Sequence, residues 1–97
     1  MSRSIISNEK KCWMCGTTRN LHRHHIFHGV ANRPLSEKYG CWVYLCGFHH
    51  NLSEYGVHFD KEMDTVLKKL AQKRWEDEFG IRKEFIETFG RNYLGGD

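Results

Sequence analysis

The 97-residue sequence lacks several features that mark whole classes of protein. It has no long apolar run, and no apolar stretch follows Met1, so we expect neither a membrane span nor a signal peptide. It also has no internal repeat, no low-complexity segment and no evident linker. These absences predict one domain, residues 1–97, in the cytoplasm, where cysteine thiols stay reduced.

Hydrophobic residues are also few, at 39% of the chain, so a domain of this length can build only a modest core. Such small domains usually need a disulfide or a metal cross-link. Four cysteines and seven histidines are present. In a reducing compartment this composition favours a bound metal ion over disulfides.

The net charge of +3 is small but unevenly distributed. Residues 1–50 carry seven Lys/Arg against two acids, whereas residues 51–97 carry eight against ten. All seven histidines lie between His22 and His58. The basic first half suits a polyanion such as a phosphate backbone, although an ordinary solvated basic surface would give the same charge pattern.

The first half of the chain predicts a tight turn followed by two strands. Residues 12–16 form the turn, in which a glycine supplies unusual backbone angles. Alternation over residues 20–27, and β-branched and aromatic residues over 41–46, predict the strands. The loop between them, residues 28–40, is expected to hold a short helix that begins at Pro34 and stops at the final glycine.

The second half is expected to be helical. Residues 47–56 predict a short helix ended by a glycine, and a longer helix starts after Asp60, a good N-cap, and stops before Gly80. A last helix covers about 82–89. The apolar residues at helical spacing are Met63, Val66, Leu67, Leu70, Ala71, Trp75 and Phe79, followed by Phe85, Ile86 and Phe89. We expect this helical part to be a packing scaffold.

Two chelating pairs predict a structural zinc site. Cys12 and Cys15 are separated by two residues, and so are Cys46 and His49. Each pair can bind one ion from a single turn, and two pairs complete a closed tetrahedral site. A rival all-cysteine site would use Cys41, but Cys41 and Cys46 would face opposite sides of the second strand. One pair on a tight turn and one at a helix start is the arrangement of a treble-clef finger.

The remaining histidines are divided by the geometry of the first strand, because alternate residues of a strand face opposite sides. The predicted faces are Leu21, Arg23 and His25 on one side, and His22, His24 and Ile26 on the other. If the strand folds against the short helix, His24 or His25 can approach His50. We expect His22 and His28 to be surface or supporting residues.

Four short pieces, "CWMC", "HHIF", "WVYLC" and "CGFHH", together resemble the HNH endonuclease family, also called ββα-metal or His-Me finger nucleases. They cover roughly residues 12–58. The ending "HHNLSEYGVH" is most similar to small phage-type HNH proteins related to RecA-dependent (Ref-type) nucleases. The resemblance implies an α+β, zinc-bound treble-clef or ββα-metal finger, encoded by a phage, with a helical extension over residues 60–94.

The resemblance also implies roles for single residues. His25 would be the general base that takes a proton from the water attacking a DNA phosphodiester. The ligands of a catalytic divalent ion (Mg²⁺, Mn²⁺, Ni²⁺ or Zn²⁺) would be His24, His50 and His58. The arginines that would hold DNA phosphates are Arg19, Arg23 and Arg33. The second nitrogen of the base needs an orienting partner, and Cys41 stands where the family commonly has asparagine. Asn32 and Asn51 are candidate substitutes outside that position.

Two other functions stay open. A catalytically inactive zinc finger could bind nucleic acid or a protein, and the cysteine at the asparagine position favours it. An inhibitor or adaptor of a host enzyme could act through the C-terminal helices. For the nuclease we expect a monomer or weak dimer, with a protein partner in recombination or in phage or host DNA processing.

Overall fold

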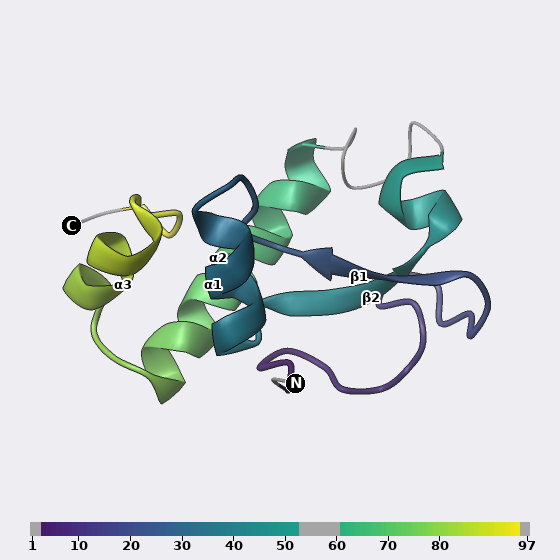
Figure 1. The fold of residues 1–97 in the computed structure, drawn as a ribbon, viewed down its shortest axis with the longest axis horizontal. Coiled ribbons are helices and arrows are strands. Elements are labelled where there is room, and N and C mark those ends of the chain that lie inside the picture. The colour runs from purple at the N-terminus through teal and green to yellow at the C-terminus, as the bar shows by residue number, and fades with distance from the viewer. Residues whose placement is uncertain (1–2, 53–60, 96–97) are drawn as a thin grey trace.

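The computed structural model describes residues 3–52 and 61–95, and it has the predicted α+β composition (Figure 1). Two antiparallel strands form the only sheet within those residues. The elements are β1 (Leu21–His25), α1 (Asn32–Tyr39), β2 (Trp42–Cys46), η1 (Phe48–Leu52, a π-type turn), α2 (Lys61–Glu78) and α3 (Arg82–Phe89). The long helix α2 and the last helix α3 follow the predicted ranges closely, while the expected N-cap Asp60 and stop Gly56 lie outside the described residues.

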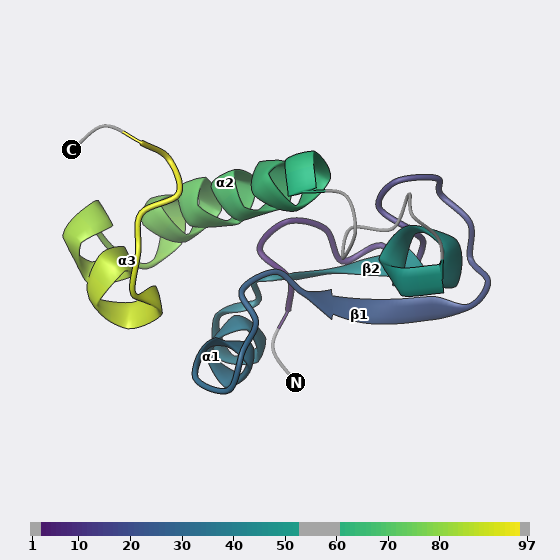
Figure 2. The same cartoon turned by 90° about the horizontal axis from the view of Figure 1, so that it is seen from above.

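The register of the strand pair sets which histidines face which side. His24 pairs with Val43 and His25 with Trp42. Figures 1 and 2 show α1 beside the end of β1, whereas η1 lies at the opposite end of the strand pair. His24 and His25 are adjacent in β1 and therefore lie on opposite faces of the strand, as its alternation predicted.

The helix α1 begins two residues earlier than expected. It starts at Asn32, so Pro34 is its third residue rather than its first. The proline is tolerated there because the first four N–H groups of a helix have no intrahelical acceptor. The helix ends at Gly40 as predicted, with a left-handed φ of 76°. A Cβ at this glycine would also collide with the backbone oxygen of Arg3.

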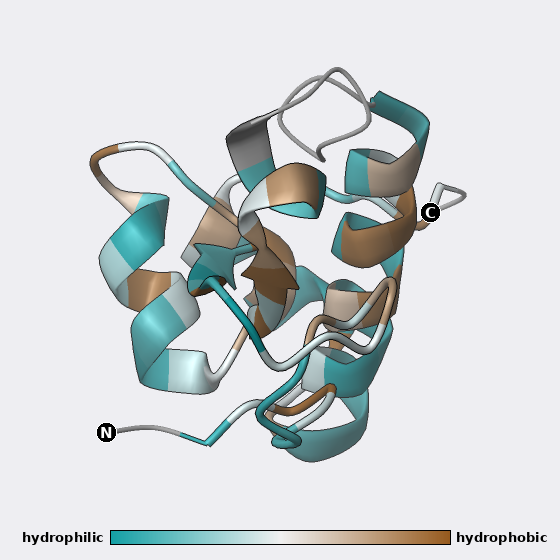
Figure 3. Ribbon diagram, turned by 90° about the vertical axis from the view of Figure 1, so that its right-hand side faces the viewer, coloured by the Kyte–Doolittle hydropathy of each residue, from teal (hydrophilic) through white to brown (hydrophobic). Residues whose placement is uncertain are grey.

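The core joins the strand pair to the C-terminal helices. Phe27, just after β1, lies against Phe85, Phe89 and Tyr93, with ring centroids 4.7–5.4 Å apart. Figure 3 shows hydrophobic residues concentrated on the strands and on the helix turns that face them. The buried residues of this core are Cys12, Ile26, Phe27, Cys41, Val43, Leu45, Cys46, Leu67, Ala71, Trp75, Phe85 and Phe89.

Two members of the apolar stripe predicted for the long helix are exposed. Val66 and Phe79 are each about half exposed, while Leu67, Ala71 and Trp75 form the buried face. The buried face is thus narrower than the sequence pattern indicated. Within the described residues no helix is long and apolar enough to cross a membrane.

Candidate metal centre and histidine cleft

The turn that carries Cys12 and Cys15 is held by its own backbone. The N–H of Gly16 donates to the carbonyl of Cys12 at 2.8 Å, and φ of Gly16 is +80°. The N–H of Trp13 donates to the carbonyl of Tyr44 at 2.8 Å, which attaches the turn to β2. The tight turn predicted at residues 12–16 therefore forms, and it is fixed against the strand that ends in Cys46.

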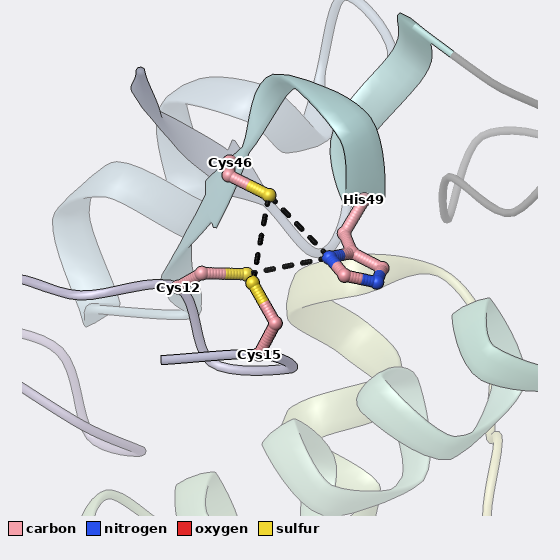
Figure 4. Close-up of side chains that lie close together, drawn as sticks. All are labelled: Cys12, Cys15, Cys46 and His49. Carbon is pink, nitrogen blue, oxygen red and sulfur yellow. Dashed lines mark hydrogen bonds between the residues drawn. The ribbon is translucent and has the colours of Figure 1, made fainter. Parts of the chain in front are cut away.

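Cys12, Cys15, Cys46 and His49 converge on one point, with all four ligand atoms within 4.8 Å of one another (Figure 4). The Sγ atoms of Cys15 and Cys46 lie 3.8 Å apart. Nδ1 of His49 lies 3.4 Å from Sγ of Cys46 and 3.8 Å from Sγ of Cys12.

These distances fit a tetrahedral ion. Zinc bonds of about 2.3 Å to sulfur and about 2.0–2.1 Å to nitrogen put neighbouring ligand atoms roughly 3.5–3.8 Å apart. Three thiols and one imidazole are also a common donor set for structural zinc. The four residues predicted from their spacing can therefore hold a metal ion such as zinc.

The surroundings favour the thiolate form of Cys12, which is the form that binds metal. Burial acts to raise the pKa of Cys12, but backbone hydrogen bonds from Cys46, Cys15 and Met14 outweigh it and lower the pKa to about 6. Several N–H groups aimed at one sulfur stabilise negative charge there. The site is thus prepared for a cation before any ion is bound.

Cys41 is not part of this cluster, so the all-cysteine alternative is wrong for the arrangement observed. Its side chain is fully buried in the hydrophobic core. Burial raises the pKa of Cys41 to about 12. A thiol in this environment stays protonated and serves as a core residue.

Two histidines of β1 meet His50 of η1. The ring centroids of His24 and His50 are 5.3 Å apart, and those of His22 and His50 are 5.1 Å apart. Nδ1 of His22 lies 3.0 Å from Nδ1 of His50. We predicted that His24 or His25 would approach His50, and His24 does so, whereas His22 was expected to be only a surface or supporting residue.

His25 faces the other side and meets α1. Its Nε2 lies 3.3 Å from Oε1 of Glu37. Nη1 of Arg23 donates to both oxygens of the same carboxylate, at 2.9 and 2.7 Å. The guanidinium carbon of Arg23 also lies 3.9 Å from the ring centroid of Trp42. Arg23, predicted to hold phosphate, is therefore already paired with a carboxylate.

His24, His25 and His50 all line one cleft of about 810 Å³. Its lining is Arg23, His24, His25, His28, Gly29, Val30, Arg33, Pro34, Glu37 and His50. Of the other predicted phosphate ligands, Arg33 lies in the cleft, whereas the exposed Arg19 is not among its described lining residues. The expected metal ligand His58 and the side chain of Asn51 lie outside the described part of the chain.

Asn32, the other candidate partner for the base, has a different contact. Its side-chain amide donates to the carbonyl of Phe89 at 3.1 Å, linking α1 to α3. Glu37 was missed at the sequence level. A signal existed, because Glu37 and Glu9 are the only two acids in residues 1–50.

A second metal ion has fewer ligands gathered for it. Among the described residues, the Cys/His cluster is the only group of three or more ligand atoms that close together. Three imidazoles lie near one another, those of His22, His24 and His50, but they do not form a complete set of metal ligands.

No protein-family model, no curated protein and no solved structure matches this chain.

Proposed function

We propose that this protein is a metal-dependent HNH endonuclease of the treble-clef, or ββα-metal, type that hydrolyses DNA phosphodiester bonds. One observation carries the proposal: His24 faces His50 next to a Cys₃His cluster, and His25 opens onto the same cleft. A metal-binding module without catalysis has no need for this second group of imidazoles.

The chemistry follows from the properties of imidazole. A neutral imidazole has one ring nitrogen without a hydrogen, so His25 can accept a proton from water there. The water oxygen forms a bond to phosphorus, its proton passes to His25, and the bond from phosphorus to the 3′ oxygen breaks. The leaving oxygen takes a proton from solvent. A divalent ion held by His24, His50 and His58 would stabilise the charge that develops on the phosphate oxygens.

The charge of the cleft supports a phosphate substrate. Arg33 and His28 line it together with the proposed base. The acid Glu37 is already paired with Arg23, so its charge is offset within the protein. Basic side chains in a hollow attract a polyanion and lose strength as salt rises.

The test is cleavage of supercoiled plasmid by zinc-loaded protein with added Mg²⁺, Mn²⁺, Ni²⁺ or Zn²⁺. We expect nicked product with at least one of these ions. His25→Ala should lose cleavage while keeping its fold and DNA binding. Lys69→Ala removes an exposed basic side chain of α2 that does not line the cleft, and this variant should still cut. The absence of cleavage with every ion, from protein of verified zinc content, would reject the nuclease.

The second candidate is a zinc-binding module that holds nucleic acid or a protein without cutting it. The buried Cys41 favours this candidate, because it stands at the family's asparagine position and cannot orient a base in the cleft. A comparison of wild type with His25→Ala distinguishes the two functions. Tight DNA binding by wild type and His25→Ala alike, with no cleavage by either, would select the binding module.

A further inference from the structure

We propose that Glu37 is the positioning residue for His25: its carboxylate holds the Nε2–H of the base, so that Nδ1 is left to accept the proton of water. This inference rests on the proposed nuclease function for its catalytic meaning. The contact itself is a property of the fold and can be tested separately.

The geometry joins three side chains from two elements. Oε1 of Glu37 lies 3.3 Å from Nε2 of His25 and 2.9 Å from Nη1 of Arg23. The second oxygen, Oε2, accepts from the same Nη1 at 2.7 Å. Both carboxylate oxygens therefore accept from the guanidinium, and Oε1 also meets the imidazole of His25.

The support behind Glu37 is rigid. The neighbouring Ser36 is fully buried, and its hydroxyl donates to the carbonyl of Phe27 at 2.5 Å while accepting from the N–H of Phe27 at 3.0 Å. These two bonds fasten α1 to Phe27, two residues after His25 ends β1. Arg23 in turn lies over the ring of Trp42, which limits its movement. A base needs such an orienting shell to hold one geometry.

A contribution to folding stability does not by itself explain why Glu37 contacts Arg23 and His25. The side chain of Glu37 is 41% exposed, and exposed ion pairs contribute little to folding. His25 is much less exposed, at 14%, and both side chains line the cleft. The main effect of a carboxylate at this position is therefore on the side chains that it contacts in the cleft, and His25 is one of them.

The contact between Glu37 and His25 also supplies an orienting partner for the base, which the residue at the family's asparagine position does not provide. Imidazole has two nitrogens, and the hydrogen bond made by one decides which of them can accept a proton. Cys41 is buried in the core and cannot make that bond in the cleft. Glu37 makes it from α1 instead, and a carboxylate is a stronger acceptor for an N–H group than a neutral amide oxygen.

The first test observes the hydrogen bond by NMR on zinc-loaded, ¹⁵N-labelled full chain, with His25→Ala used for assignment. We expect a resolved Nε2–H resonance from His25 in wild type. It should move upfield in Glu37→Gln, which offers a neutral acceptor, and vanish in Glu37→Ala. The matched control Glu87→Gln, an exposed carboxylate on α3, should leave it unchanged. An unchanged resonance in Glu37→Ala, or a proton found on Nδ1, would overturn the proposal.

The second test measures plasmid cleavage. Loss of an orienting partner typically costs about 10–100-fold. We expect Glu37→Ala to lower kcat by about that factor with KM nearly unchanged, and Glu37→Asp to restore part of it. An equal kcat in Glu37→Ala would overturn the positioning role. If wild type cuts nothing, the nuclease proposal fails, and the NMR result still decides whether Glu37 fixes His25.

Discussion

The sulfur of Cys12 lies 3.8 Å from Nδ1 of His49, although 37 residues separate them in the chain. This contact joins the turn at residues 12–16 to the π-type turn that follows β2. In the chain, the two turns are separated by β1, α1 and β2. Ordering such a long loop costs conformational entropy that a small core offsets poorly. An ion bound at this point would supply the missing free energy, because binding to a folded site is coupled to folding.

The first prediction concerns removal of the metal. We expect Cys12→Ser and His49→Ala to bind less than one zinc per chain and to melt well below wild type. Strong chelation of wild type should have the same effect. His28→Ala, which removes an exposed histidine, should keep both zinc and melting temperature. The measurements are elemental analysis and thermal melting by circular dichroism. A melting curve unaffected by chelation would refute the metal cross-link.

The second prediction is that the C-terminal helices and the metal centre unfold together. Phe85 is fully buried and lies against Phe27 and Trp75. Removing a buried aromatic side chain costs about 3–5 kcal/mol. We expect Phe85→Ala to lower the midpoint of zinc release and of tryptophan fluorescence equally in urea. Ile86→Ala, a substitution at the neighbouring exposed residue, should change both midpoints far less. Two separate midpoints would mean that α2 and α3 form an independent unit.

Much of this structure could be predicted because its signals are local. Spacing placed Cys12 and Cys15 on a turn, and alternation along β1 placed His24 and His25 on opposite faces. Gly40 marked a helix end, because glycine tolerates the left-handed backbone angle that follows many helices, and Gly80 marked the end of α2 without adopting that angle. Each of these inferences needs only a few consecutive residues.

The contacts of single side chains could not be predicted in the same way. Glu37 reaches His25, and His22 reaches His50, only because of how α1 and η1 pack against β1. Packing of that kind depends on the whole core rather than on a local pattern. The exposure of Val66 shows the same limit, because helical periodicity does not say how wide a face its partners cover.

The third prediction concerns Cys41. Burial raises its pKa from 9.0 to about 12, so the folded state keeps a proton that the unfolded state loses at lower pH. The stabilising effect is complete below about pH 9 and is lost as pH rises from 9 to 12. We expect Cys41→Ala to flatten the fall in stability over this range. In zinc-loaded, folded protein, iodoacetamide should label the buried Cys41 far more slowly than in urea-unfolded protein, as measured by peptide mass spectrometry. Equal labelling rates would contradict the burial.

The fourth prediction concerns the imidazoles around His50. His50 is a proposed ligand of the catalytic ion, and Nδ1 of His22 lies 3.0 Å from Nδ1 of His50, where it can support that ligand. We expect zinc-loaded protein to bind one further Ni²⁺ in calorimetry. His50→Ala should abolish this binding, and His22→Ala should weaken it by about 10–100-fold. His28→Ala is the matched control. Binding unchanged in His50→Ala would place the ion elsewhere.

The last prediction tests the fastening of α1 to β1. Ser36→Ala removes a hydroxyl that both donates to and accepts from the backbone of Phe27 in the buried core. Leaving buried backbone groups without partners costs about 1–3 kcal/mol. We expect that loss in urea unfolding, while Thr18→Ala, an exposed substitution, changes stability by less than about 0.5 kcal/mol. If α1 also carries the support of His25, Ser36→Ala should broaden the Nε2–H resonance of His25 even though Glu37 is intact. A sharp, unshifted resonance in a destabilised Ser36→Ala would show that Arg23 alone is enough to hold the carboxylate in place.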